Sequence, residues 1–214
     1  KIELPPQTPP VPVPSSSAFD SARSYFSLIR REPAFQSFTV KKFVYTSAIA
    51  LGQPILPLFF VREVHATDAQ IGTITMVMTM VMLVGYFLWP WMSRKYSGRV
   101  VLLATTLGLA FYPALTAATV KVEWIIVYAG IAGLFQAGLD LVFFDELMKT
   151  VPPEYSATFV SFSQSLQYFS AVIAPTVGTW FADSIGLGGA LWVSAGLRLL
   201  GFVLFLIPDR RRVT

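Results

Sequence analysis

Asp140 stands inside a long apolar run and is the first candidate for chemistry in this sequence. An ionisable group within a bilayer costs about 2.5–3.5 kcal/mol and faces the interior of a helix bundle. Asp140 shares an i, i+4 stripe with Tyr128 and Gln136, wide enough to line an aqueous pathway. Two roles stay open for it: a substrate or proton pathway, or helix packing.

Arg198 interrupts the last apolar run. It continues a stripe of small residues that suits close helix packing, so we expect a structural role for it. The guanidinium would either pair with Asp140 or reach the inner helix ends near Asp145 and Glu146.

Uncharged residues also interrupt the apolar runs. Gln53 and Pro54 interrupt the first run, and proline kinks a helix and frees backbone carbonyls. A Gly- or Pro-interrupted helix points to a transport site, although a kink kept for packing is the alternative. The fifth run adds Gln164 and Gln167 as further pathway candidates.

Composition excludes most enzyme classes. Charged residues make up only 13% of the chain, there is no Cys, and His65 is the single histidine. Thiol catalysis, thiolate metal sites and histidine triads therefore lack their residues. No phosphate-binding loop of the Walker type is present. We expect no enzyme activity, no cofactor, no metal and no nucleic-acid partner.

The elements that must position these groups are membrane helices. A bilayer core needs about 20 apolar residues in a helix, and long continuous runs exclude the short alternating segments of a barrel. The sequence predicts an all-α membrane protein with six transmembrane helices, near 41–61, 70–92, 99–119, 122–145, 156–182 and 187–207.

Lys and Arg set the expected orientation. Of the 16 basic residues, a majority fall at the termini and in the 93–98 and 146–155 loops, whereas Arg62 and Lys121 lie on the other side. The positive-inside rule makes both termini cytoplasmic. Trp89 and Trp91 are expected in the interfacial aromatic belt.

The chain divides into four parts. Residues 1–16 form a Pro-rich tail or linker, and the region lacks the apolar core of a signal peptide. Residues 17–38 predict a cytoplasmic amphipathic helix that ends at Pro33 and lies either on the membrane or on neighbouring loops. Residues 39–209 form the transmembrane domain, and 210–214 a basic cytoplasmic tail.

Three segments resemble the C-terminal six-helix half of a major facilitator superfamily (MFS) transporter. They are "LIRREPAFQSF" followed by "ALGQPILPLFFVREV", the basic loop in "GYFLWPWMSRKYSGRVVLL", and "VPPEYSATFVSFSQSLQYFSAVIAPTVGTWFADSIG". The basic loop departs from the family pattern because Ser93 replaces an acidic residue and Trp89 a common glycine.

The resemblance implies a half bundle built as a 3+3 repeat, with Gln53, Gln136 and Asp140 lining a central cavity. Arg94 and Arg99 would pair with Asp145 and Glu146 as a cytoplasmic gate. The function implied is half of a secondary transporter that moves a small solute by alternating access, with proton coupling through Asp140.

Two halves are needed for such a cycle. The partner would be a missing N-terminal half, a second copy or another membrane complex, all in a lipid bilayer, and we expect the bacterial inner membrane. The alternative is a non-transporting MFS-like subunit or assembly factor docked on a larger membrane complex.

Overall fold

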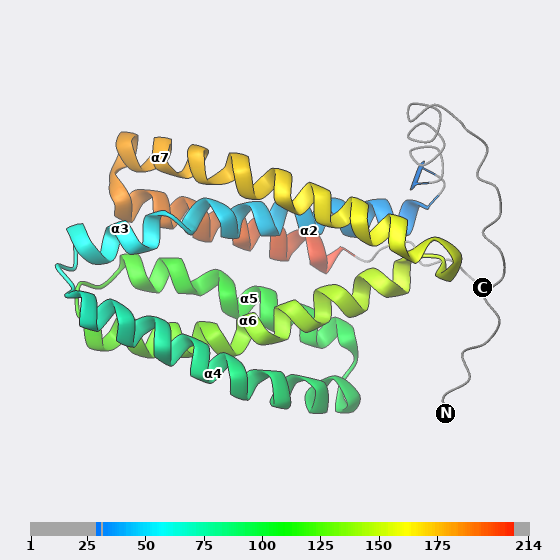
Figure 1. Ribbon diagram of the computed structural model, residues 1–214, viewed down its shortest axis with the longest axis horizontal. Coiled ribbons are helices and arrows are strands. Elements are labelled where there is room, and N and C mark those ends of the chain that lie inside the picture. The colour runs from blue at the N-terminus through cyan, green and yellow to red at the C-terminus, as the bar shows by residue number, and fades with distance from the viewer. Residues whose placement is uncertain (1–28, 31, 208–214) are drawn as a thin grey trace, which may run out of the picture.

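The computed structural model describes residues 29–30 and 32–207, which fold into long helices packed side by side (Figure 1). No strand occurs within these ranges, so the predicted all-α class is confirmed. In chain order the elements are α2 (Pro33–Gly52), α3 (Ile55–Arg62), α4 (Asp68–Lys95), α5 (Gly98–Ala117), α6 (Val122–Thr150), the short 3₁₀ helix η1 (Pro153–Tyr155) and α7 (Ser156–Leu206).

Pro33 begins a helix instead of ending one. It occupies the first turn of α2, where the missing proline N–H costs nothing because no intrahelical acceptor exists there. The first membrane helix therefore starts earlier than the expected residue 39 or 41. The amphipathic segment predicted for 17–38 lies mostly outside the described residues.

Gln53 and Pro54 separate α2 from α3, as the sequence predicts for an interrupted first helix. The Gln53 N–H still donates to the Ala50 carbonyl at 3.3 Å, and Pro54 starts the next helix. Together the two helices make one apolar stretch from Pro33 to Arg62.

The longest element, α7, reverses direction within its length. A straight helix of its 51 residues would extend about 76 Å, far beyond a bilayer core. At Gly186 the backbone leaves the helical region, with φ of 81° and ψ of 164°. The first half, yellow to orange, and the second half, orange to red, then run side by side (Figure 1).

Five helical stretches are long and apolar enough to cross a membrane, against the six predicted. The difference lies in α7, which covers both of the last two predicted spans, 156–182 and 187–207.

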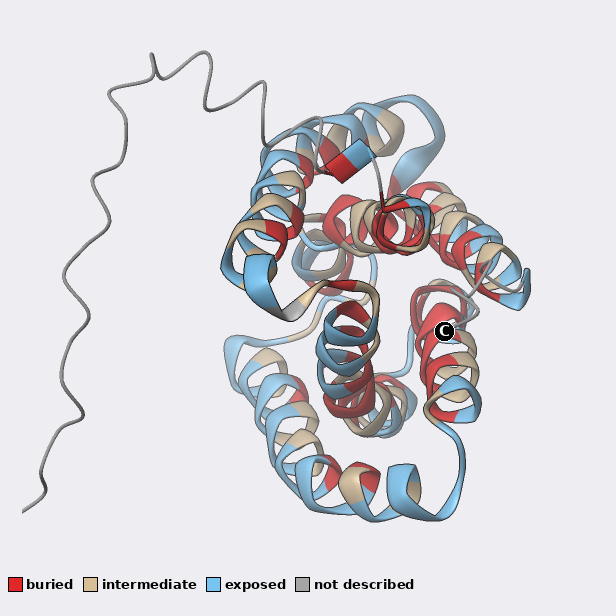
Figure 2. Ribbon diagram, turned by 90° about the vertical axis from the view of Figure 1, so that its right-hand side faces the viewer, coloured by how far each residue is buried: buried red, intermediate tan, exposed pale blue. Residues whose placement is uncertain are grey.

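Packing links helices from opposite ends of the chain. α2 packs mainly against α7, whereas α6 packs against α4 and α5, and α5 also contacts α7. The buried residues lie on the inward faces of these helices, and α4 stays largely exposed (Figure 2). The Trp89 indole is an exception on α4: it is buried and donates to the Leu134 carbonyl at 2.6 Å. It therefore does not stand in an interfacial belt as predicted.

Candidate functional site

Asp140 is the centre of a polar cluster on α6. Its carboxylate accepts hydrogen bonds from the Gln136 amide at 2.8 Å and from the Tyr86 hydroxyl at 3.0 Å. Gln136 lies one turn earlier on α6, as the stripe predicts, whereas Tyr86 comes from α4. Asp140 is exposed on the surface of the described bundle. The cluster therefore presents a carboxylate to whatever covers this face.

Tyr86 could not be found from spacing. It is one of several aromatic residues in an apolar run, beside Phe87, and only the packing of α4 against α6 brings its hydroxyl to Asp140. Tyr128 extends the predicted stripe, but its ring stacks on Trp124 with centroids 6.2 Å apart near the start of α6. It does not join the Asp140 cluster.

Gln53 lies exposed at the break between α2 and α3, with Pro54 half-buried beside it. Backbone carbonyls near the break meet the neighbouring helix. The Ser194 hydroxyl donates to the Ala48 carbonyl at 2.8 Å, and Gly178 approaches the Leu51 carbonyl so closely that a Cβ there would lie 2.3 Å from it. One face of the interrupted helix α2–α3 thus packs on α7, and the Gln53 side chain lies exposed on another face.

Arg198 is buried, with 3% of its surface exposed, but it pairs with no carboxylate among the described residues. Its Nη1 donates to the Leu109 carbonyl at 3.1 Å, and its Nε has no hydrogen-bond partner. The predicted pairings with Asp140, Asp145 or Glu146 are therefore wrong, because the side chain extends between α5 and the break in α2. A structural role fits its surroundings: a Cβ at Gly52 would lie 3.4 Å from Nη2.

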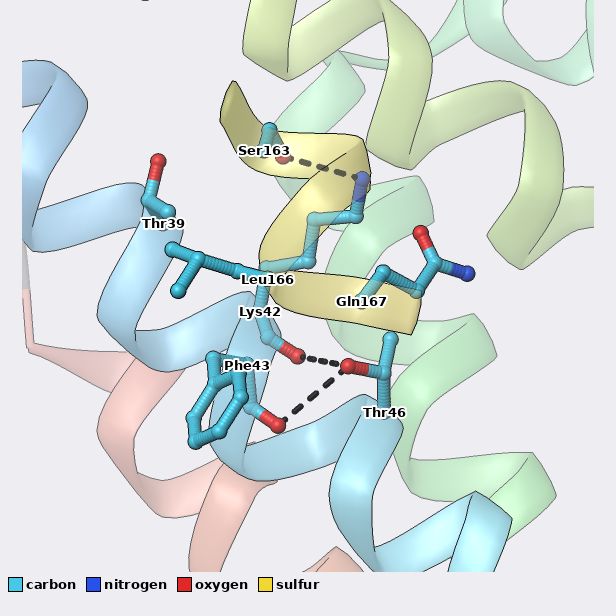
Figure 3. Close-up of a pocket in the computed structure, with 7 residues that line it drawn as sticks. All are labelled: Thr39, Lys42, Phe43, Thr46, Ser163, Leu166 and Gln167. Atoms are coloured by element: carbon cyan, nitrogen blue, oxygen red, sulfur yellow. Dashed lines mark hydrogen bonds between the residues drawn. The ribbon is translucent and has the colours of Figure 1, made fainter. Parts of the chain in front are cut away.

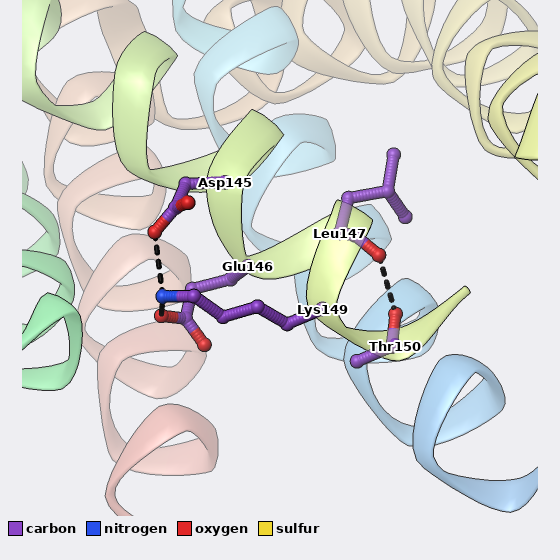
Figure 4. Close-up of polar contacts among 5 residues, drawn as sticks. All are labelled: Asp145, Glu146, Leu147, Lys149 and Thr150. Carbon is purple, nitrogen blue, oxygen red and sulfur yellow. Dashed lines mark hydrogen bonds and ion pairs between the residues drawn. The ribbon is translucent and has the colours of Figure 1, made fainter. Parts of the chain in front are cut away.

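Asp145 and Glu146 form an ionic cluster near the C-terminal end of α6, but their partner is Lys149 (Figure 4). The Lys149 ammonium lies 2.6 Å from the Asp145 carboxylate and 2.8 Å from that of Glu146. One helical turn brings these groups together without any tertiary contact. The expected pairing with Arg94 or Arg99 is not what the structure shows.

The two arginines have other surroundings. Arg94 is exposed at the end of α4, and Arg99 donates from Nη2 to the Leu206 carbonyl at 2.9 Å. Arg99 thus links α5 to the last turn of α7. The cluster still touches the basic loop, because a Cβ at Gly98 would lie 2.8 Å from Glu146 Oε1.

A polar groove between α2 and α7 was not predicted as a site (Figure 3). We call it the α2–α7 groove; it is lined by Thr39, Lys42, Phe43, Thr46, Ser163, Leu166 and Gln167. Of the candidates on the fifth run, Gln167 lines this groove, whereas Gln164 is exposed and lies outside it.

Lys41 and Lys42 directly precede the first apolar run and belong to the basic residues that the positive-inside rule places in the cytoplasm. Both are buried. Lys41 donates to the Ile207 carbonyl at 2.7 Å, which joins the start of α2 to the end of α7. A basic pair directly preceding an apolar run gives no sign of this burial, because snorkelling lysines have the same pattern.

The described part of the chain contains no group of three or more His, Cys, Asp or Glu residues arranged to hold a metal ion. What the described residues offer is one exposed carboxylate with a Tyr and a Gln, one polar groove with a lysine, and one ionic cluster near the C-terminal end of α6.

Comparison with known proteins supplies a family. The family model described as Major Facilitator Superfamily matches residues 10–214, nearly the whole chain. None of the curated proteins compared with the chain matches it.

Proposed function

Because the chain belongs to the Major Facilitator Superfamily, a family of multi-pass membrane transporters, we propose that it forms one half of a secondary transporter. This half moves a small solute by alternating access, and protons are coupled through Asp140. The observation that carries the proposal is the Asp140 carboxylate, which is exposed on the bundle within an apolar span and is held by Gln136 and Tyr86.

The cost of that carboxylate argues against a lipid-facing position. Moving an ionised side chain to the bilayer centre costs about 2.5–3.5 kcal/mol on insertion scales, so such groups face a bundle interior or a water-filled cavity. Asp140 faces neither within this chain, because it is exposed. A second bundle opposite this face would enclose it, and in this superfamily the substrate site lies between two such halves.

Six crossings are proposed for the membrane topology. Gly186 would place the reversal of α7 at the outer surface, so that α7 crosses twice and both termini lie in the cytoplasm. Basic residues support this orientation. Arg94 and Lys95 end α4 and Arg99 stands in the first turn of α5, and in this topology they fall on the same side as Lys149 at the end of α6. We propose the bacterial inner membrane as the location.

The packing supports a 3+3 repeat. The first group of helices is α2, α4 and α5, and the second is α6 with the two halves of α7. The first helix of each group packs mainly on the later helices of the other group: α2 on α7, and α6 on α4 and α5. We expect this reciprocal packing, in which the first helix of each group lies against the other group, from two related three-helix units.

The partner follows from the same argument. A missing N-terminal six-helix half, a second copy of the chain or another membrane complex would cover the Asp140 face. Mass determination of the purified protein in detergent distinguishes a second copy from a different subunit.

Proton-coupled uptake tests the function. The chain, with any subunit that co-purifies, is reconstituted in vesicles that contain a pH-sensitive dye. Monocarboxylates, sugars and amino acids are then added one at a time to the external medium. We expect at least one solute to acidify the lumen, and Asp140→Asn to abolish the signal while the unfolding midpoint stays within a few degrees. Asp183→Asn, at an exposed carboxylate outside the cluster, is the matched control and keeps the signal. Undiminished acidification in Asp140→Asn contradicts the assignment.

A non-transporting subunit is the second candidate, and α4 is the observation that favours it. An exposed apolar row along this helix includes Met76, Met80, Leu83, Phe87 and Trp91, of which Phe87 is 77% exposed. Such a row would suit docking on a larger complex as well as lipid. Stoichiometric co-purification with another complex, together with no flux for any solute, would favour this function.

A further inference from the structure

Both carboxylate oxygens of Asp140 have a hydrogen-bond donor. The Gln136 amide donates to Oδ1 at 2.8 Å, and the Tyr86 hydroxyl donates to Oδ2 at 3.0 Å. An ionised carboxylate is an acceptor only, and hydrogen bonds to its charged form favour that form. Within the described part of the chain no Lys or Arg forms an ion pair with Asp140. The charge is therefore held by two neutral donors.

The two donors differ in how they are tied to Asp140. Gln136 lies one turn away on the same helix, so it stays beside the carboxylate whenever α6 is intact. Tyr86 belongs to α4, so its bond exists only while α4 lies against α6. Of the two donors, Tyr86 is thus the one whose bond depends on the packing of two helices.

Close packing on either side of Tyr86 fixes its helix against α6. A Cβ at Gly85 would lie 2.8 Å from the Ala137 Cβ and 3.2 Å from the Leu134 carbonyl oxygen. One turn later on α4, the Trp89 indole donates to that same carbonyl at 2.6 Å. The backbone contact and the indole bond have no titratable partner, whereas the Tyr86 bond ends on a carboxylate. The contact between α4 and α6 therefore includes one bond that depends on charge.

Tyr86 is the titratable side chain of α4 that faces Asp140. The charged and titratable side chains on α2, α5 and the end of α6 have partners of their own, which are the Ile207 carbonyl for Lys41, the Phe143 ring for Lys42, the Thr106 carbonyl for Tyr45, the Leu206 carbonyl for Arg99, and Asp145 and Glu146 for Lys149. The bond to Tyr86 is therefore the contact from another helix that acts directly on the Asp140 charge.

We propose that Tyr86 is a positioning residue for proton binding at Asp140. Its hydroxyl holds the carboxylate in the ionised form while α4 and α6 are in contact, so release of this bond favours uptake of a proton. Because linkage is reciprocal, a proton on Asp140 weakens the same contact between the two helices. The inference rests on the proposed transport function and names the regulation of its proton site.

Carbodiimide labelling measures the protonation of Asp140 without any solute, because dicyclohexylcarbodiimide reacts with the neutral carboxylic acid. The purified chain, with any subunit that co-purifies, is labelled in detergent over a series of buffers from acidic to alkaline pH. Peptide mass spectrometry then quantifies the adduct on Asp140. In Tyr86→Phe, which removes only the hydroxyl, we expect the labelling profile to move by about one unit toward higher pH, since the ionised form loses one of its two donors.

Tyr168→Phe on α7 is the matched control, because Tyr168 is exposed in an apolar helix and is not a donor to Asp140. Its labelling profile should coincide with that of the wild type. Asp140→Asn gives the background, since an amide does not form the adduct. If Tyr86→Phe fails to fold, Tyr86→Leu removes the same hydroxyl and should give a shift in the same direction.

The direction of the shift decides the proposal, because a Tyr hydroxyl can also accept a hydrogen bond. A profile moved to lower pH would mean that Tyr86 accepts from the neutral acid, and an unmoved profile would mean that it does not hold the carboxylate. Either result overturns the proposal. The expected shift without solute-driven acidification of vesicles would leave the role of Tyr86 assigned and refute transport. Acidification that requires Asp140, together with an unmoved profile, would do the reverse.

Discussion

Arg198 shows how a single buried cation is accommodated without an opposite charge. Its guanidinium donates to the Leu109 carbonyl, and its Nε lacks a partner. A buried charge pays a desolvation cost that a carbonyl offsets only in part. The side chain fills the space between α5, the break in α2 and the second half of α7.

Substitution separates volume from charge. Arg198→Met keeps most of the volume and removes the buried charge, so we expect the free energy of unfolding to stay within about 1 kcal/mol or to rise. Arg198→Ala leaves a cavity and should lose about 2–5 kcal/mol. Thermal unfolding of both variants in one detergent gives the comparison. An equal loss in both would mean that the charge itself stabilises the break at Gln53.

Close backbone contacts decide the packing of the helices. A Cβ at Gly133 on α6 would lie 2.1 Å from the Met78 carbonyl oxygen of α4, and one at Gly178 on α7 would lie 2.3 Å from that of Leu51 on α2. Small residues of this kind let membrane helices approach. The two contacts hold the two largest helix pairings of the bundle.

Alanine substitution at these positions should therefore separate the helices. We expect Gly133→Ala and Gly178→Ala each to cost about 1–3 kcal/mol, because the obstructing atom is backbone and cannot move aside. Gly196→Ala, on α7 with nothing within 4 Å of its Cβ, is the control and should gain up to about 1 kcal/mol of helix propensity. Equal unfolding midpoints in the three variants would contradict tight packing at the crossings.

Predictability from sequence differs between local and tertiary features. The proximity of Gln136 to Asp140 and the break at Pro54 each depend on one stretch of chain alone. Helical spacing predicted the first, and the proline predicted the second. Contacts of Arg198, Trp89 and Tyr86 depend on which helices pack together, and an apolar run has no periodic signal that reveals its neighbours. The pairing of Arg99 with Asp145 was an implication of the family resemblance, whereas in the structure Lys149, one turn further along the same helix, binds Asp145.

The whole bundle depends on the reversal of α7, which decides how often the chain crosses the membrane. If α7 turns back at Gly186, Asp183 lies on the opposite side from Glu154. If it were a single span, the C-terminal tail would lie across the membrane from Glu154. The two topologies thus place the same residues in different compartments.

Single cysteines can report these positions, because the chain has no native Cys. Asp183 and Glu154 are exposed, so replacing either by Cys disturbs no buried contact. In intact cells we expect a membrane-impermeant maleimide to label Asp183→Cys, and Val120→Cys as an outer reference. Glu154→Cys and Ser93→Cys should react only in inverted vesicles, since both belong to the basic inner side. Labelling of Asp183→Cys and Glu154→Cys from the same side would exclude six crossings, because the first half of α7 would then not span the membrane.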